Sequence, residues 1–112
     1  MMDGKAIDDA IKTIAYHYGR KAQSLQLCEE CAELVQVVSK LVRVERKDRK
    51  KKLELKLALA EEIADVRIML EQMAFFYGIS RRRVTMDIKR KVQRQLERIA
   101  EEDGNRRCHP TV

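Results

Sequence analysis

The chain has 112 residues, of which 45% are hydrophobic, 38% are charged and 4% are aromatic, with four glycines and one proline. These proportions exclude a wholly disordered chain and a β-sandwich or barrel, and no apolar run approaches the roughly 20 residues of a membrane span. The net charge of +6 keeps polyanionic partners in consideration.

Four segments have apolar residues at the three- and four-residue spacing that predicts amphipathic helices. They cover residues 3–17, 21–44, 53–77 and 81–102. Gly19 and Gly78 are placed to end the first and third helices, and Ser80 is placed to cap the start of the fourth. We expect a single domain over residues 1–102 and a flexible tail over residues 103–112.

The two long central segments are joined by residues 45–52, which include no apolar side chain and are expected to form an exposed connection. A short connection favours an antiparallel helix hairpin. Two adjacent apolar stripes on residues 21–44 indicate a helix that is buried over a wide face. A chain this small buries only part of its surface on folding. We therefore expect an all-α, four-helix bundle-like protomer with the hairpin at its centre, which assembles into an oligomer.

Carboxylates lie inside the apolar stretches of both hairpin helices, in LQLCEECAELVQVV and in LALAEEIADVRIML. Glu30 and Glu33 are three residues apart and share a helix face, and Glu62 and Asp65 repeat that spacing. In an antiparallel hairpin both pairs fall near mid-helix, so they can meet. Converging carboxylates raise one another's pKa values unless a cation neutralises them. Ligands that are all oxygen suit Mg²⁺ or Mn²⁺.

Two other interpretations apply to these acids. Acids at this spacing commonly form a solvated face, but here apolar residues flank each pair on two sides. A di-iron bundle needs Glu-x-x-His motifs, whereas His17 and His109 lie outside both segments. A non-redox Mg²⁺ site is the interpretation that fits best.

Two motifs in these helices occur in the order of a known family. EExxE is present as Glu29-Glu30-Cys31-Ala32-Glu33, and ExxD is present as Glu62-Ile63-Ala64-Asp65, with 28 residues between them. Upstream are Tyr18, Gly19 and Gln23, and downstream is a K-x-x-R-x-x-x-R pattern at Lys91, Arg94 and Arg98. In these motifs the sequence resembles the all-α nucleoside triphosphate pyrophosphohydrolases of the MazG-like superfamily.

The resemblance implies hydrolysis of a nucleoside triphosphate between its α and β phosphates, which gives a nucleoside monophosphate and pyrophosphate. It implies that Mg²⁺, with Mn²⁺ as a substitute, is held by the carboxylates of Glu30, Glu33, Glu62 and Asp65. Glu33 or Glu30 would orient or deprotonate the attacking water. The triphosphate and the departing pyrophosphate would be held by Lys91, Arg94 and Arg98. Family members work as dimers or tetramers, so a homo-oligomer is expected.

Three further residues are candidates for contact with the base or sugar of a nucleotide. Gln23 lies on nearly the same helix face as Glu30 and Glu33, although a surface position is the alternative. His17 and Tyr18 could line a base pocket or pack at the end of the first helix.

Three cysteines, an odd number, argue against a disulfide framework. The segment MMDGKAIDD is too acidic and polar for a signal peptide, so we expect a cytoplasmic protein. Cys28 and Cys31 form a Cys-x-x-Cys pair without the βαβ context of a redox motif, and we interpret both as small buried hydrophobic side chains.

Two basic blocks give the main alternative to an enzyme. Residues 43–52 hold seven bases and two acids, and residues 81–107 hold ten bases and five acids. These blocks would suit a basic helical module that binds nucleic acid or assembles with partners, with its acids on a solvated face. No helix-turn-helix spacing or aromatic stacking pattern accompanies them, so nucleic acid is not an expected partner. Within the family, phosphoribosyl-ATP is the alternative substrate.

Overall fold

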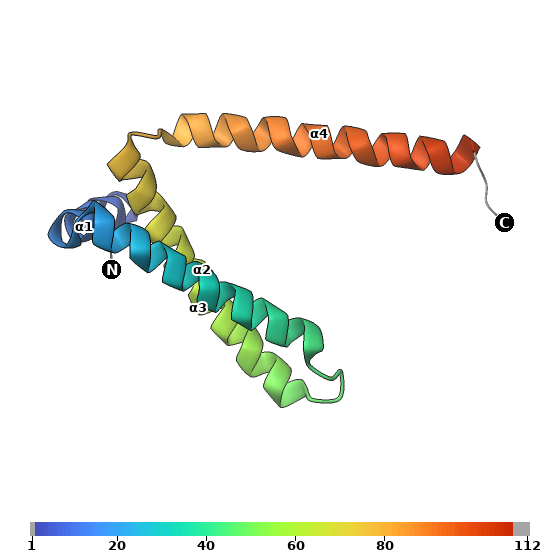
Figure 1. Ribbon diagram of the computed structural model, residues 1–112, viewed down its shortest axis with the longest axis horizontal. Coiled ribbons are helices and arrows are strands. Elements are labelled where there is room, and N and C mark those ends of the chain that lie inside the picture. Colours follow the sequence, from blue (N-terminus) through green and yellow to red (C-terminus); the bar gives the residue numbers. More distant parts are fainter. Residues whose placement is uncertain (1, 109–112) are drawn as a thin grey trace. The chain divides into compact units, whose positions relative to one another are not determined.

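The computed structural model describes residues 2–108, and over that range the chain forms four α-helices and no strand (Figure 1). The helices are α1 (Gly4–Tyr18), α2 (Arg20–Arg43), α3 (Arg49–Tyr77) and α4 (Arg81–Cys108). The all-α prediction is confirmed. Among these residues no helix is both long enough and apolar enough to span a membrane.

Two glycines end helices because their backbones adopt positive φ angles that other residues rarely accept. Gly19 has a φ of 88° and separates α1 from α2, and its N–H donates to the Ala15 carbonyl over 2.9 Å. Gly78 has φ 65° and ψ 34° and ends α3 in the left-handed conformation. The Ser80 Oγ then accepts a hydrogen bond from the Arg83 N–H over 3.1 Å, which caps α4 as the sequence predicts.

The start of α3 lies four residues before the predicted one. Residues 49–52 are helical, although the absence of apolar side chains there predicted an exposed connection. The Asp48 Oδ1 accepts the Lys51 N–H over 3.0 Å, so a side-chain cap stabilises the first turn without burial.

The end of α4 also differs from the prediction. Residues 103–108 continue the helix instead of forming the start of a flexible tail, and residues 109–112 lie outside the described part of the chain. A helix that has already nucleated gains one hydrogen bond for each residue it adds, so even a polar sequence can extend it.

The chain divides into two compact units, Met1–Gly78 and Ile79–Val112, and the single domain over residues 1–102 stays a prediction. The break coincides with the helix stop at Gly78 and the cap at Ser80. The second unit contains α4, in which Asp87 pairs with Arg83 over 3.1 Å and with Arg90 over 3.5 Å. The hydrogen bond from Arg83 is the main cause that lowers the pKa of Asp87 below its usual range.

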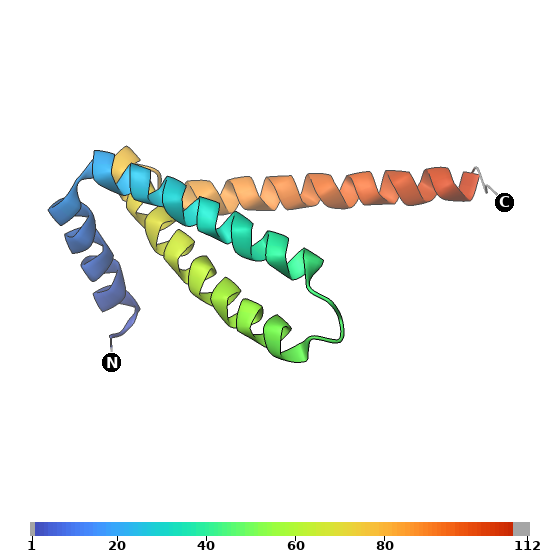
Figure 2. The same ribbon diagram turned by 60° about the horizontal axis from the view of Figure 1, so that its bottom comes forward.

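The first unit is built on α2 and α3, which lie side by side and run in opposite directions (Figure 1 and Figure 2). Helix α1 contacts both of them, and its Tyr16 ring packs edge-on against Phe75 of α3 with centroids 5.5 Å apart. Among the described residues the buried hydrophobic side chains are Ala15, Leu55, Val66 and Met69. The hairpin therefore has a thin core.

Much of the apolar surface of the hairpin is left in contact with water. On α2, Val42 is 80% exposed and Val35 is 67% exposed, and on α3 Leu57 is 61% exposed. The cysteine pair follows the same pattern, because Cys28 is exposed and Cys31 is only half-buried. The interpretation of both cysteines as buried was wrong, since the wide apolar face of α2 is not fully covered within one chain.

Candidate metal centre

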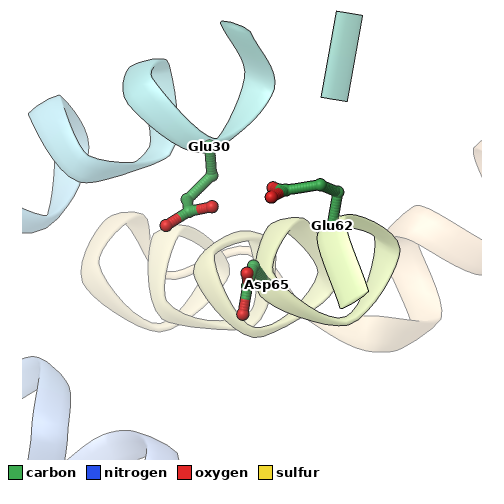
Figure 3. A group of neighbouring side chains, drawn as sticks. All are labelled: Glu30, Glu62 and Asp65. Atoms are coloured by element: carbon green, nitrogen blue, oxygen red, sulfur yellow. The ribbon is translucent and has the colours of Figure 1, made fainter. Parts of the chain in front are cut away.

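Three carboxylates converge near the middle of the α2–α3 hairpin. Glu30 extends from α2 toward Glu62 and Asp65 on α3 (Figure 3). One oxygen from each of the three lies within 4.8 Å of the others. Residues three apart on a helix share a face, and the antiparallel pairing brings that face of α3 onto Glu30. The three residues were all among the predicted metal ligands.

Two oxygens of this cluster lack a hydrogen-bond partner. Glu30 and Glu62 are half-buried, and the Oε2 atom of each is shielded from solvent and accepts no hydrogen bond from the described residues. The other Glu30 oxygen accepts from the Gln26 Nε2 over 2.9 Å. A buried acceptor without a hydrogen-bond partner is costly, and either a bound cation or a proton on one of the carboxyl groups would offset that cost.

The electrostatics of the cluster centre on Glu62. Desolvation, its hydrogen bond with Glu30 and the charges of Glu33, Glu30 and Asp65, in that order, raise the pKa of Glu62 from 4.5 to about 7. Near neutral pH the group therefore changes between its charged and its neutral form. A cation among these oxygens would oppose every one of these effects, because it favours the charged carboxylate.

The oxygen set is of a kind that hard divalent cations bind. Mg²⁺ and Mn²⁺ prefer carboxylate oxygens and water as ligands. Mg²⁺ commonly keeps several water molecules and binds one or two protein carboxylates. The cluster has no histidine or cysteine ligand within the group that the structure brings together. The donor chemistry therefore fits Mg²⁺ or Mn²⁺ better than Zn²⁺.

Glu33, the fourth predicted ligand, lies outside this three-residue cluster. Its side chain is exposed, yet its charge helps to raise the pKa of Glu62, which places it beside the cluster. The neighbouring acids Glu29 and Glu61 are also exposed. The hairpin thus separates an inner set of carboxylates from outer ones on the same helices.

Gln23 has a different role from the predicted contact with base or sugar. Its side chain is buried, and its Nε2 donates to the Gln72 Oε1 across the hairpin over 2.8 Å. This amide nitrogen is therefore engaged with α3. Sequence reasoning missed Gln72 altogether, although a lone glutamine within the apolar stretch IMLEQMAFF was a signal for a buried polar contact.

The remaining predicted residues are exposed. His17 and Tyr18 lie at the end of α1, where their rings pack edge-to-face with centroids 4.7 Å apart. Lys91, Arg94 and Arg98 lie along one face of α4, in the second unit. The proposed contacts of these five residues with a nucleotide stay predictions.

Comparison with known proteins finds no matching family model, no similar curated protein and no similar solved structure. The resemblance to the MazG-like superfamily therefore depends on the motifs in the sequence alone.

Proposed function

We propose that the protein is a Mg²⁺-dependent nucleotide pyrophosphohydrolase that cleaves a ribo- or deoxynucleoside triphosphate between its α and β phosphates. The observation that supports this proposal best is the convergence of Glu30, Glu62 and Asp65, with two shielded oxygens that accept no hydrogen bond from residues 2–108. The sequence places these three residues in the EExxE and ExxD motifs. Three of the four carboxylates that the motifs predict as ligands are therefore among those that converge.

In this proposal Glu30, Glu62 and Asp65 would hold the ion, and Glu33 is the exposed carboxylate beside them. When bound, Mg²⁺ neutralises the charge of the triphosphate and polarises its α-phosphorus. Water then forms a bond to the α-phosphorus while the bond to the bridging oxygen breaks. Glu33 would accept the proton of the water, because its side chain is exposed and its charge acts on Glu62 of the cluster.

In this proposal the cationic groups of α4 bind the phosphates of the substrate. Lys91, Arg94 and Arg98 share a face, and guanidinium groups bind phosphate oxygens through paired hydrogen bonds. They would hold the triphosphate and neutralise the pyrophosphate as it leaves. The products are a nucleoside monophosphate and pyrophosphate.

The protomer is proposed to be bundle-like and to work as a cytoplasmic homo-oligomer. The support is the exposed apolar surface of the first unit, which includes Leu25, Val35 and Leu57 at 59–67% exposure. A second copy that covered such side chains would gain about 25 cal/mol for each Å² of apolar surface removed from water.

The test is pyrophosphate release from a panel of nucleoside triphosphates and phosphoribosyl-ATP, with and without Mg²⁺. The variant is Glu62→Gln, and the matched control is Glu61→Gln, which removes the adjacent but exposed carboxylate. We expect Mg²⁺-dependent release that falls at least about a hundredfold in Glu62→Gln, the upper range for disturbed metal sites, and that stays near wild type in Glu61→Gln. Full activity in Glu62→Gln, or no release by folded wild-type protein on any substrate, would contradict the proposal.

A further inference from the structure

The contact between Gln23 and Gln72 is unusual for its burial. Gln72 is 1% exposed and Gln23 is 7% exposed, and they are the only buried polar side chains among the described residues. A neutral hydrogen bond contributes only about 1 kcal/mol to stability, and two apolar side chains would fill the same space. A buried polar pair of this kind adds little stability, but it is satisfied in only one alignment of the two helices.

That alignment is the one that assembles the carboxylate cluster. Glu30 follows Gln23 by seven residues on α2, and Asp65 precedes Gln72 by seven residues on α3. Seven residues are about two helical turns, so in antiparallel helices the register that pairs the glutamines also sets Glu30 opposite Asp65. The contact between the Ser24 Oγ and the Met73 Sδ, at 3.5 Å, belongs to the same register.

The apolar side chains define this register poorly. Leucine occupies every second position from residue 53 to residue 59 in α3, so more than one face of that segment can pack against α2. The first turn of α3, residues 49–52, has no buried side chain. This turn could therefore unwind and lengthen the connection between α2 and α3 without loss of core packing. A shift of one turn would displace α3 by about 5.4 Å and would separate the acids while keeping apolar groups together.

We propose that the hydrogen bond between Gln23 and Gln72 fixes the register of α2 and α3 and so positions the cation-binding carboxylates. Both glutamines are positioning residues that act through the helices and do not touch the ion. Buried polar groups are known to specify register at some expense of stability. The inference rests on the proposed function for its metal-binding consequence, but its claim about register is independent of that function.

The experiment replaces both glutamines together, in Gln23→Leu/Gln72→Leu, and measures three quantities. The unfolding temperature should not fall, because no polar group is left without a partner. The affinity for Mn²⁺, titrated by calorimetry as a probe of the cluster, should fall about tenfold or more, as it does when supporting residues of metal sites are lost. The nuclear Overhauser effect between the Met73 methyl group and the Ser24 β-protons should weaken.

Leu55→Ala is the control, since Leu55 is a buried residue of the same hairpin away from the cluster. It should lower the unfolding temperature while keeping both the Mn²⁺ affinity and the Met73–Ser24 signal of the folded protein. If the leucine pair fails to fold, Gln23→Met/Gln72→Met offers side chains of closer shape. A double variant that keeps the Met73–Ser24 signal at full strength overturns the inference. Wild-type protein that shows this signal but binds no Mn²⁺ would instead refute the metal site.

Discussion

Two of the polar contacts between α2 and α3 lie about two helical turns apart, and they differ in charge and in hydrogen bonding. The Gln23–Gln72 contact is neutral, buried and hydrogen-bonded. The Glu30–Glu62–Asp65 cluster is acidic, and within the described part of the chain two of its shielded oxygens accept no hydrogen bond. A satisfied polar contact can be explained within the chain. The acidic one is where the proposed cation would act.

The largest effect that would sharpen this comparison is stabilisation by metal. Mg²⁺ at roughly a hundred times its Kd should raise the free energy of unfolding by about 2.7 kcal/mol, since only the folded hairpin assembles the carboxylates. Thermal unfolding with increasing Mg²⁺ measures the effect. Glu62→Gln should remove it and Glu61→Gln should keep it. If the melting curve of the wild-type protein does not respond to Mg²⁺, the proposed difference between the carboxylate cluster and the glutamine contact is wrong.

Removing one partner of the glutamine contact should lower the free energy of unfolding by nearly as much as Mg²⁺ raises it. Gln72→Leu leaves the buried Gln23 amide without its acceptor, so we expect a loss of about 1–3 kcal/mol. Urea unfolding at neutral pH, without Mg²⁺, measures the loss. Glu30→Gln should not destabilise the metal-free protein in this way, because it removes a negative charge from a repulsive cluster. Equal losses of unfolding free energy in Gln72→Leu and Glu30→Gln would contradict the distinction between the glutamine contact and the carboxylate cluster.

The dependence of stability on pH should have opposite signs for the cluster and for an ordinary ion pair. The pKa of Glu62 is about 7 in the folded chain and 4.5 ordinarily, so its stabilising contribution is complete below pH 4.5. That contribution is lost as the pH rises through about 7. The free energy of unfolding of metal-free protein should therefore fall over this range, and Glu62→Gln should flatten the fall.

Asp87 provides the contrast, because Arg83 lowers its pKa. Its stabilising contribution is present above the ordinary pKa of 3.8 and is lost as the pH falls below it. Asp87→Asn should therefore leave the profile between pH 4.5 and 7 unchanged. Urea titrations at a series of pH values measure both variants, and a metal-free stability that rises toward pH 7 would contradict the account of Glu62.

The smallest expected effect is that of the half-buried polar contact beside the glutamines. The Ser24 hydroxyl donates to the Met73 sulfur over 3.5 Å, and a thioether is a weak acceptor. Ser24→Ala should change the free energy of unfolding by less than about 0.5 kcal/mol, like most substitutions away from critical contacts. A loss as large as that of Gln72→Leu, measured in the same urea series, would show that burial is not what distinguishes the glutamine pair.

The sequence was most informative where helical spacing alone decides which residues meet. Glu30, Glu62 and Asp65 could be predicted as neighbours because acids three apart share a face and an antiparallel hairpin aligns mid-helix positions. The same reasoning could not tell that Glu33 would lie outside the cluster, since a shared helix face does not decide which of its residues the other helix covers.

Contacts between residues far apart in the chain were beyond such reasoning. Gln23 was a candidate for contact with base or sugar, or for a surface position, because nothing local reveals a partner 49 positions away. The early start of α3 depends on one cap at Asp48, and the extension of α4 depends on cooperative helix growth. Neither is visible in the apolar periodicity from which the helix bounds were drawn.

The first turn of α3 gives the hairpin an unusual response to ionic strength. Arg49 and the three lysines that follow it stand at the positive end of a helix dipole, where acids are favoured. Their mutual repulsion is screened over a Debye length of about 10 Å in 0.1 M salt. Adding salt should therefore strengthen the turn whose unwinding would let the helices slide, whereas salt weakens most charged contacts. The register of this hairpin should therefore be held more firmly in a saline solution than in a dilute one.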